Sequence, residues 1–410
     1  MTKHTNAPAL RFPEFRDEWN QNKLSDVVNV YDGTHQTPKY TNEGIKFLSV
    51  ENIKTLNSDK YISKEDFIKE FKIHPEYGDI LMTRIGDIGT PNIVNLKEPL
   101  AYYVSLALLK PININSYFLN SLILSPTVQN ELWRKTLHIA FPKKINKNEI
   151  AKVLINYPTF NEQEKIGYFF SKLDRQIELE EKKLELLEQQ KREYMQKIFS
   201  QELRFKNEDG IQFEEWSFQS LSKIFDLITD YVANGSFADI RKNVSYSEKE
   251  DYAYVIRLQD ASSNWKGPFV YTNKHAYEFL SKTKLFSKDI IMSNVGTVGK
   301  TFRVPNLDKP MTLGPNSLLL RSSNNDMDFL YFYLNSSIFK KTLLKIITPG
   351  VQAKVNKTDL KTLILSIPSK EEQKKIGTFF NALDKNIEIQ GNKVNFLKQR
   401  KQGLLQKMFI

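Results

Sequence analysis

Cysteine is absent from this sequence of 410 residues, which excludes disulfide bonds and thiolate metal sites. Histidine is scarce, and its positions lack the close spacing that a zinc site requires. These positions are His4, His35, His74, His138 and His275. No apolar stretch approaches the roughly 18 residues that span a bilayer, and residues 1–15 lack the apolar core of a signal peptide. We therefore expect a cytoplasmic protein without a membrane segment or a metal site.

Recognisable catalytic motifs are also lacking. No Pro-Pro pair occurs, which excludes the Asn/Asp-Pro-Pro-aromatic motif of an adenine methyltransferase. Residues 289–301 approach a phosphate-binding loop, but Asn294 replaces its first glycine, and a strand and turn replace the helix that should follow. The corresponding residues 84–91 keep the glycines and contain no lysine. We expect these glycines to form a tight hairpin in each half, and we predict no catalytic residue.

The composition is that of a globular protein with a basic surface. Hydrophobic residues make up 40% of the chain and charged residues 26%, and the formal net charge is +11. Such a surface attracts polyanions, of which nucleic acid is the commonest. A generally basic proteome would explain the same charge, so charge alone does not identify the partner.

The sequence contains an internal repeat at an offset of 210 residues. Residues 158–199 and 368–409 align without a gap, and 19 of these 42 positions are identical. Residues 10–12 recur as residues 203–205, ahead of each globular part. The repeat predicts two similar globular domains, each followed by a long helix. The predicted boundaries are 1–157 for the first globular domain, 158–200 for the first helix, 201–367 for the second globular domain and 368–410 for the second helix.

Both repeated segments have the heptad pattern of a coiled coil. The packing positions are Ile166, Phe170, Leu173, Ile177, Leu184 and Leu187 in the first copy, and Ile376, Phe380, Leu383, Ile387, Val394 and Leu397 in the second. The pattern continues through Tyr194, and polar residues interrupt both copies, at Glu180 with Gln390 and at Lys191 with Lys401. We predict that the two helices pair as an antiparallel coiled coil about a pseudo-twofold axis. Alternatively, each apolar stripe faces the core of its own domain.

The globular domains are predicted to be mixed α+β. Strand-like runs such as 44–50 and 252–256 occur beside helical stretches at 116–137 and 328–347. Residues 20–77 share little with residues 217–287, so the two domains are expected to share a framework and differ in content. A capping box, Thr159 with Glu162 and Ser369 with Glu372, is predicted to begin each long helix.

Polar and basic residues in predicted loops are candidates for binding double-stranded DNA, because amides pair with adenine, and arginine and lysine pair with guanine or bind phosphate. In the first half they are Thr34, His35, Gln36, Thr37, Lys39, Tyr40, Arg84, Lys143, Lys144 and Lys147. In the second half they are Asn234, Gly235, Ser236, Arg241, Arg257, Asn294, Lys300, Gln352, Lys354 and Lys357. Each is equally compatible with an ordinary exposed loop residue.

This arrangement resembles the specificity subunits of Type I restriction-modification systems. Both helical segments begin with the pattern Pro-x-x-x-Glu-Gln-x-Lys-Ile, at Pro158 and at Pro368. Residues 32–40 are also similar to a stretch found in many target-recognition domains of that family. The resemblance covers essentially the whole chain.

The resemblance implies a non-catalytic subunit of a bacterial defence system. Each globular domain would read one half of an asymmetric, interrupted DNA target, and the paired helices would hold the two domains at a set spacing. Two methylation subunits and further restriction subunits would bind this frame. The cofactors S-adenosylmethionine, ATP and Mg²⁺ would then belong to those partners, and none to this chain.

Two other functions remain possible from the sequence. A free-standing, bilobed DNA-binding or architectural protein would use the same frame without a modification partner. A nuclease or nucleotide hydrolase with unrecognised motifs would depend on a residue such as Lys300.

Overall fold

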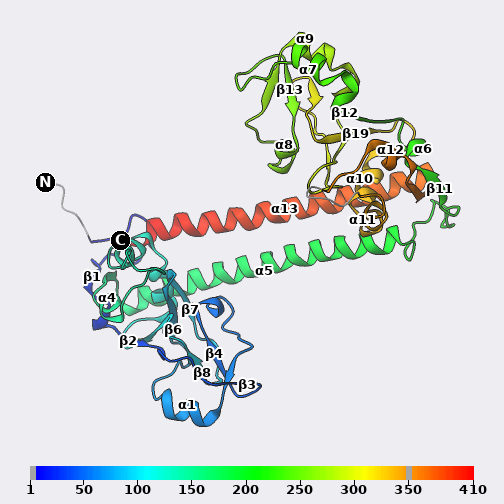
Figure 1. The fold of residues 1–410 in the computed structure, drawn as a ribbon. Helices are drawn as coiled ribbons and strands as arrows, with labels where there is room; N and C mark the ends of the chain where they lie inside the picture. Colours follow the sequence, from blue (N-terminus) through cyan, green and yellow to red (C-terminus); the bar gives the residue numbers. More distant parts are fainter. Residues whose placement is uncertain (1–5, 348–352) are drawn as a thin grey trace. The chain divides into compact units, whose positions relative to one another are not determined.

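The computed structural model describes residues 6–347 and 353–410, which form two compact units (Figure 1). The first unit comprises the chain up to Lys182 together with Gly391–Ile410, and the second comprises Lys183–Gln390. Each unit therefore contains a globular part and segments of both long helices. The domain boundaries drawn from the sequence repeat stay a prediction. Within the described ranges, no helix is both long and apolar enough to cross a membrane.

The globular part of the first unit is built on two four-stranded sheets. The larger sheet is antiparallel, in the order β2 (Val28–Asp32), β9 (Leu106–Pro111), β6 (Ile80–Ile85) and β7 (Asp87–Ile93). The smaller sheet has the order β3 (Tyr40–Thr41), β5 (Tyr61–Ile62), β4 (Ile45–Leu48) and β8 (Leu100–Tyr102), with β4 and β8 parallel. A separate pair joins β1 (Asn20–Lys23) to β10 (Leu154–Tyr157).

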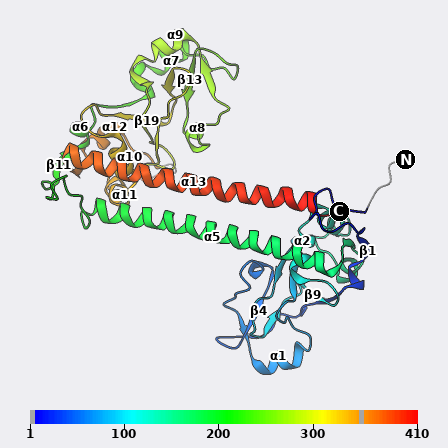
Figure 2. The ribbon, with the colours of Figure 1, turned by 180° about the vertical axis from the view of Figure 1, so that it is seen from behind.

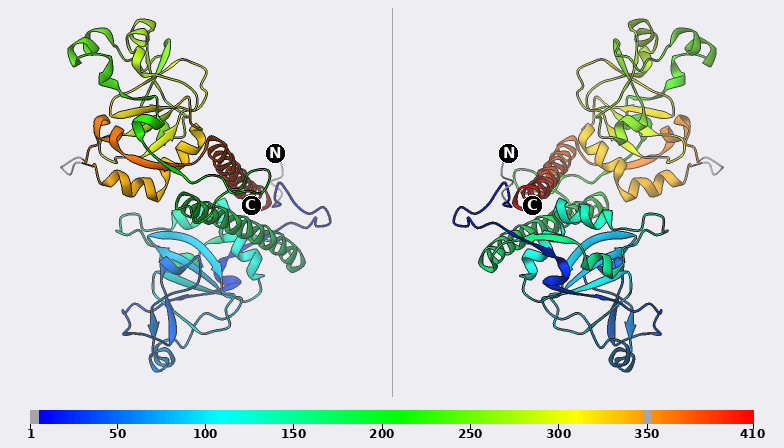
Figure 3. Two further views of the ribbon diagram at one scale, coloured as in Figure 1. Left: turned by 90° about the vertical axis from the view of Figure 1, so that its right-hand side faces the viewer. Right: turned by 90° about the vertical axis from the view of Figure 1, so that its left-hand side faces the viewer.

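Among the described residues, four short α-helices complete this globular part. They are α1 (Lys64–Glu70), α2 (Ser116–Ile123), α3 (Pro126–Arg134) and α4 (Lys147–Ala151). The helical stretch predicted at 116–137 is two helices, because Ser125 caps a new helix by accepting a hydrogen bond from the Val128 amide and Pro126 occupies its first turn. The strands of this unit, in blue and cyan, lie on one side of the first part of α5 (Phe160–Phe199), as Figure 3 shows.

The second unit repeats these sheets. Its larger sheet has the order β12 (Leu227–Asp230), β19 (Ser317–Arg321), β16 (Ile290–Ser293) and β17 (Thr301–Arg303). Its smaller sheet has the order β14 (Val270–Thr272), β13 (Ala253–Ile256), β18 (Met311–Leu313) and β15 (Lys284–Leu285), with β13 and β18 parallel. The separate pair joins β11 (Ser217–Ser220) to β20 (Ile364–Ile367).

The short helices of the second unit precede the long helix α13 (Lys370–Met408). They are α6 (Leu221–Ile224), α7 (Phe237–Asn243), α8 (Leu258–Ser262), α9 (Lys274–Phe279), α10 (Met327–Asn335), α11 (Ser337–Leu344) and α12 (Lys357–Thr362). The stretch predicted at 328–347 is also two helices, since Ser336 accepts a hydrogen bond from the Phe339 amide and caps α11.

The two units share their strand order even where their sequences differ. Both smaller sheets contain the same core of three strands, β5-β4-β8 and β14-β13-β18, although β4, β5, β13 and β14 lie where the sequence shows little repetition. They differ at the edge: β3 extends the first sheet beyond β5, whereas β15 extends the second beyond β18. The predicted mixed α/β fold with an internal repeat is thus confirmed.

The paired glycines form the predicted hairpins. Gly86 and Gly89 have φ of 78° and 85° where β6 turns into β7, and Gly296 and Gly299 have φ of 76° and 82° between β16 and β17. A Cβ at Gly299 would lie 2.3 Å from Leu343 Cδ2 of α11. These glycines therefore provide both the left-handed backbone and the room for a packed helix.

Within each unit, segments of α5 and α13 pack antiparallel (Figures 1 and 2). In the first unit Leu173 and Ile177 form a buried cluster with Leu397, and Lys401 binds Asp174 at 2.5 Å. In the second unit Lys191 binds Asp384, also at 2.5 Å. The two lysines that interrupt the predicted heptad are thus ion-pair positions.

The packing positions differ in burial along the helices. Ile166, Phe170, Leu173 and Ile177 are buried, as are Ile376, Phe380, Val394 and Leu397, whereas Leu184, Leu187, Leu383 and Ile387 are half-buried. Tyr194 is partly exposed, but its ring packs edge-on against Phe379 of α13, with 5.2 Å between ring centroids, and the next residue, Met195, packs against the core of the second unit.

Each core combines the beginning of one long helix with the end of the other. In the first unit Phe409 of the α13 end packs between Phe118 and Phe170, with ring centroids 5.6 Å from each. In the second unit Phe199 of the α5 end stacks on Tyr333 at 5.0 Å and on Phe380 at 5.8 Å. Phe199 and Phe409 are equivalent in the repeat, so each unit needs a residue from the other copy of the helix.

The repeated Glu-Gln pair fastens each long helix to its globular part. Glu162 is buried and accepts two hydrogen bonds of 2.7 Å from Arg11, and the pKa of Arg11 is raised by that bond. Glu372 is buried and binds Arg204 at 2.8 Å and the Trp216 indole at 3.2 Å. The predicted capping boxes are therefore only partly formed. Ser369 Oγ accepts a hydrogen bond of 3.4 Å from the Glu372 amide, but both carboxylates bind the arginines of the preceding segment rather than the helix start.

Candidate nucleic-acid interface

The predicted DNA-binding segments of the first unit meet at one edge of its larger sheet, where β2 and β6 end and β9 begins. Asp32 ends β2, Arg84 lies near the end of β6, and the two side chains form an ion pair. The Gly86 amide donates a hydrogen bond of 2.8 Å to the Lys143 carbonyl, and Thr34 forms a bridge with Tyr103 just before β9. Antiparallel pairing brings these ends together although they are far apart in the sequence.

Arg84 itself is a structural residue, which corrects the prediction that it contacts DNA. Its exposed fraction is 4%, and besides binding Asp32 its Nε donates to the Ile145 carbonyl at 2.9 Å. A guanidinium with these partners stabilises the junction of β2, β6 and the chain before α4. It is not accessible to a base edge.

The remaining predicted residues of this unit are at the surface. His35, Gln36, Thr37, Lys39, Lys143, Lys144 and Lys147 are exposed. Thr34 is half-buried and its Oγ1 accepts from the Gln36 amide at 3.3 Å, which shapes the loop. The Tyr40 ring packs edge-on against Phe47, at 5.7 Å between centroids.

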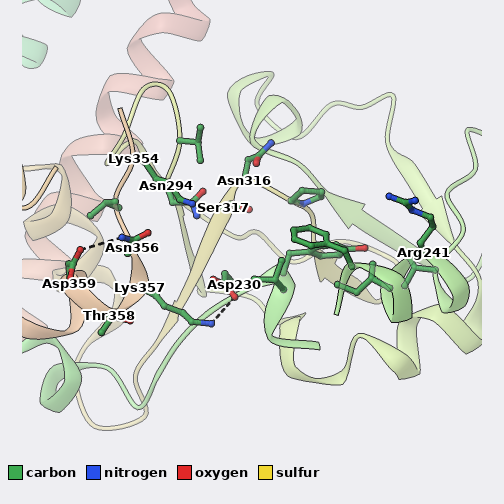
Figure 4. A pocket seen from close by; sticks show the side chains of 18 of the residues that line it. Asp230, Arg241, Asn294, Asn316, Ser317, Lys354, Asn356, Lys357, Thr358 and Asp359 are labelled. Carbon is green, nitrogen blue, oxygen red and sulfur yellow. Dashed lines mark hydrogen bonds and ion pairs between the residues drawn. The ribbon is translucent and has the colours of Figure 1, made fainter. Parts of the chain in front are cut away.

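In the second unit the corresponding edge holds a cleft of about 890 Å³ (Figure 4). Four predicted residues line it: Arg241, Asn294, Lys354 and Lys357. They come from α7, the end of β16 and the start of α12, so the fold brings together side chains more than a hundred positions apart. Asn316 and Ser317, at the start of β19, line the same cleft and were not predicted.

Charged, amide and aromatic groups share this cleft. Lys357 Nζ binds Asp230 Oδ1 at 2.9 Å, and Asn356 Nδ2 lies 3.5 Å from Asp359 Oδ2 (Figure 4). The Tyr231 and Tyr246 hydroxyls are 2.5 Å apart, and burial raises the pKa of both phenols, so they stay neutral hydrogen-bonding groups.

Asn294 occupies the position that Arg84 has in the first unit. The Ile145 amide donates to the Arg84 carbonyl at 3.0 Å, and the Val355 amide donates to the Asn294 carbonyl at the same distance. Asp230 corresponds to Asp32, because both end the strand that pairs with the equivalent strands β19 and β9. The Asn294 side chain is shorter, and its Oδ1 has no hydrogen-bond partner among the described residues. The position that Arg84 holds in one unit thus lines a cleft in the other, where Lys357 binds the equivalent aspartate instead.

Three other predicted residues of the second unit form local hydrogen bonds, and their contact with DNA stays a prediction. Asn234 Nδ2 donates to Thr283 Oγ1 at 2.8 Å, and Asn234 Oδ1 accepts from the Lys282 amide at 3.0 Å. Ser236 caps α7, and Arg257 Nη2 binds Asp260 Oδ1 at 2.7 Å. These side chains thus stabilise the loops in which they lie.

The other predicted positions of this unit are Gly235, Lys300 and Gln352. Gly235 has a φ of 156° and joins Asn234 to the cap of α7. Lys300 is exposed, with its Nζ 5.1 Å above the Phe302 ring. Gln352 lies outside the described residues.

The lining residues that were not predicted differ in whether the sequence contains a signal for them. Asn316 follows Gly314-Pro315, a turn signal, and has a φ of 62°. The aromatic residues Tyr231 and Tyr246 resemble ordinary core residues in the sequence, and nothing marked them. In the part of the chain that the structure describes, no cluster of histidine and carboxylate side chains could hold a metal ion.

Comparison with known proteins identifies the family. The family model described as "Type I restriction modification DNA specificity domain" matches residues 16–189 and again residues 214–399. A relative from Methanocaldococcus jannaschii, named as the MjaX specificity subunit of a type I restriction enzyme, is 24% identical over 98% of this chain and 95% of its own. The MjaVIII specificity subunit of the same organism is 22% identical over 97% and 92%.

Solved structures share the fold. The S subunit of a Type I restriction-modification system from M. genitalium has a TM-score of 0.58 at 15% identity, covering 98% of this chain and 99% of its own. A chain from a study of complex assembly and conformational transition of the type I R-M system has a TM-score of 0.54 at 13% identity, covering 94% and 96%.

Proposed function

The chain belongs to the Type I restriction-modification DNA specificity family, and from this premise we propose that each of its two units reads one half of a bipartite, asymmetric DNA target. The supporting observation is the combination of a shared frame with unlike surfaces. The larger sheets have the same strand order, yet the matching edge carries a buried Arg84 in one unit and a cleft with Asn294 in the other. Two unlike readers on one chain favour two unlike half-sites.

The chain selects the DNA site, and in our proposal other subunits perform the chemistry. Two methylation subunits would modify adenine with S-adenosylmethionine, and restriction subunits would cleave with ATP and Mg²⁺. The long helices offer surfaces for such partners, because Leu179 and Leu186 of α5 and Ile389 and Phe396 of α13 are exposed apolar residues. The complex would act on DNA in the cytoplasm.

A genome-wide map of methylated adenine tests this proposal. The chain is expressed with its candidate methylation subunit in a host without such a system, and each protein is expressed alone as the control. We expect one interrupted motif, methylated only when both proteins are present. A stable complex that methylates no such motif would contradict the proposed function.

A further inference from the structure

The segment that joins α3 to α4 in the first unit is uniformly basic. Residues 134–147 contain Arg134, Lys135, Lys143, Lys144 and Lys147 and no aspartate or glutamate. Arg134 also binds Glu131 at 2.9 Å, but the three lysines of residues 143–147 are exposed. This charge favours contact with a phosphate backbone.

Residues 137–144, here called the tip loop, are held at both ends. The Leu137 amide donates to the Lys144 carbonyl at 2.8 Å, and the Gly86 amide donates to the Lys143 carbonyl at 2.8 Å. His138 Nε2 donates to the Trp133 carbonyl at 2.9 Å, and Lys143 Nζ lies 4.5 Å from the centre of the Trp133 ring. The loop is therefore fastened to α3 and to the β6–β7 hairpin.

Two apolar side chains project from this loop into solvent. The exposed fraction of Ile139 is 99% and that of Phe141 is 105%, the highest among the exposed large hydrophobic residues. Water solvates these side chains poorly, so a partner that covers them gains free energy. Their neighbours on the chain indicate which partner: Lys143 and Lys144 follow directly, and Pro142 lies between.

We propose that Ile139 and Phe141 form a wedge that inserts between adjacent base pairs and unstacks one base step of the half-site read by the first unit. The inference rests on the proposed function. DNA-bending proteins insert phenylalanine, isoleucine and proline in this way while nearby cations bind the flanking phosphates. The tip loop has both components, and its anchored ends keep the wedge from folding back. A protein partner would instead have to supply many carboxylates to match this segment.

A base-analogue scan tests the wedge once the methylated motif is known. Duplexes carry 2-aminopurine, whose fluorescence rises on unstacking, at successive positions in and beside each half-site. The full chain in complex with its methylation subunit is added. We expect brightening at one step next to the first unit's half-site. The double substitution Ile139→Ala with Phe141→Ala should abolish it and weaken binding by roughly ten- to a hundredfold, the usual effect of losing one stacked base contact.

Two control variants separate wedging from general hydrophobicity. Phe141→Leu keeps a side chain that can insert and should keep most of the brightening. Ile68→Ala removes a side chain of α1 that is 74% exposed in the same unit but outside the basic segment, and it should change nothing. Because all these residues are exposed, circular dichroism of the variants should match that of the unchanged chain.

Three outcomes overturn the inference. Tight binding without brightening at any step excludes the wedge and leaves the proposed function intact. If the double-alanine variant no longer co-purifies with the methylation subunit in the absence of DNA, but the 2-aminopurine signal still rises, the tip loop binds a protein instead. Failure of the unchanged complex to bind its own motif refutes the proposed function and the wedge together.

Discussion

Glu162 and Glu372 show how a sequence motif can serve the fold rather than the ligand. Both carboxylates are buried, and each binds an arginine that lies more than 150 positions earlier. The following glutamines act in the same way: Gln163 Oε1 accepts from the Asn115 amide and Gln373 Oε1 from the Asp326 amide, each at 3.0 Å. The repeated Glu-Gln pair thus ties helix, preceding segment and globular part together.

Substitution of Glu162 by glutamine should therefore destabilise the first unit. It leaves Arg11 without its buried counter-charge, which costs about 3–5 kcal/mol for a pair of this kind. Glu178→Gln, which breaks an exposed pair with Arg175 on the same helix, should cost less than about 1 kcal/mol. Urea unfolding of the two variants measures the difference, and equal midpoints would contradict the structural role of Glu162.

The contrast between Arg84 and Asn294 makes a second prediction. In Asn294→Arg the new guanidinium can reach the space between Asp230 and the Val355 carbonyl, as Arg84 does between Asp32 and the Ile145 carbonyl. We expect the methylation map to change in one half-site, the one read by the second unit. Lys300→Ala, a loss of an exposed cation, should weaken binding without changing the motif. An unaltered motif for Asn294→Arg would show that the cleft does not read bases.

The sequence predicts which types of residue lie at the candidate DNA-binding edge of each larger sheet better than it predicts the role of each residue. Arg241, Asn294, Lys354 and Lys357 were selected as polar or basic loop residues, and they do line one cleft. Arg84 belongs to the same class, but its partner Asp32 is distant in the sequence and only the fold reveals it. Arg257 with Asp260 was a detectable case, because the aspartate lies three positions on, at the spacing of a helix cap.

At the scale of elements, both sequence-based explanations of the heptad stripe are partly right. The first turns, with Ile166 and Phe170, lie in the core of the same unit's globular part, as the single-domain alternative requires. Farther along, Leu173 and Ile177 pack on Leu397 of the other helix, as the coiled-coil prediction requires. A heptad pattern cannot distinguish the two, because each needs one apolar face.

Two glycines of α13 should respond with opposite sign to alanine. A Cβ at Gly377 would lie 2.6 Å from Asp326 Oδ1 and 3.0 Å from the Phe329 amide nitrogen, so Gly377→Ala should cost about 1–3 kcal/mol. Gly391 has open space around its Cβ position, so Gly391→Ala should gain about 0.5–1 kcal/mol from helix propensity. Thermal unfolding of both variants checks the signs; stabilisation by Gly377→Ala would disprove the close approach of α10 to α13.

At the scale of the whole molecule, the internal repeat predicted most of the architecture. It showed two like units and two like helices before any strand could be placed. It did not show that residues 20–77 and 217–287 also share strands, because a strand needs only apolar residues at suitable positions and tolerates many sequences. The different edge strands β3 and β15 had no signal at all, since each is two residues long.

The long helices should act as spacers between the two readers. One heptad inserted within residues 180–190, matched by one within residues 390–400, adds about 10 Å to each helix. We expect the methylated motif to keep both half-sites and to gain about three base pairs between them, at 3.4 Å per base pair. An unchanged spacer would contradict this role.

Exchange of one reader should change one half of the target. Replacing residues 20–155 with the equivalent part of another family member leaves the cleft of the second unit and the sequences of both long helices unchanged. The map should then show a new first half-site, the old second half-site and the old spacer. A change in both halves would be incompatible with two independent readers.

The packing of the α13 end in the core of the first unit has a consequence for biosynthesis. The core around Trp19, Phe118 and Phe170 is completed by Phe409, which is 239 positions after Phe170. At roughly 5–20 residues per second, a ribosome needs on the order of 12–50 s to cover that distance. The aromatic core of the nascent first unit therefore stays incomplete while the second unit is synthesised. During this interval we expect the first unit to depend most on chaperones.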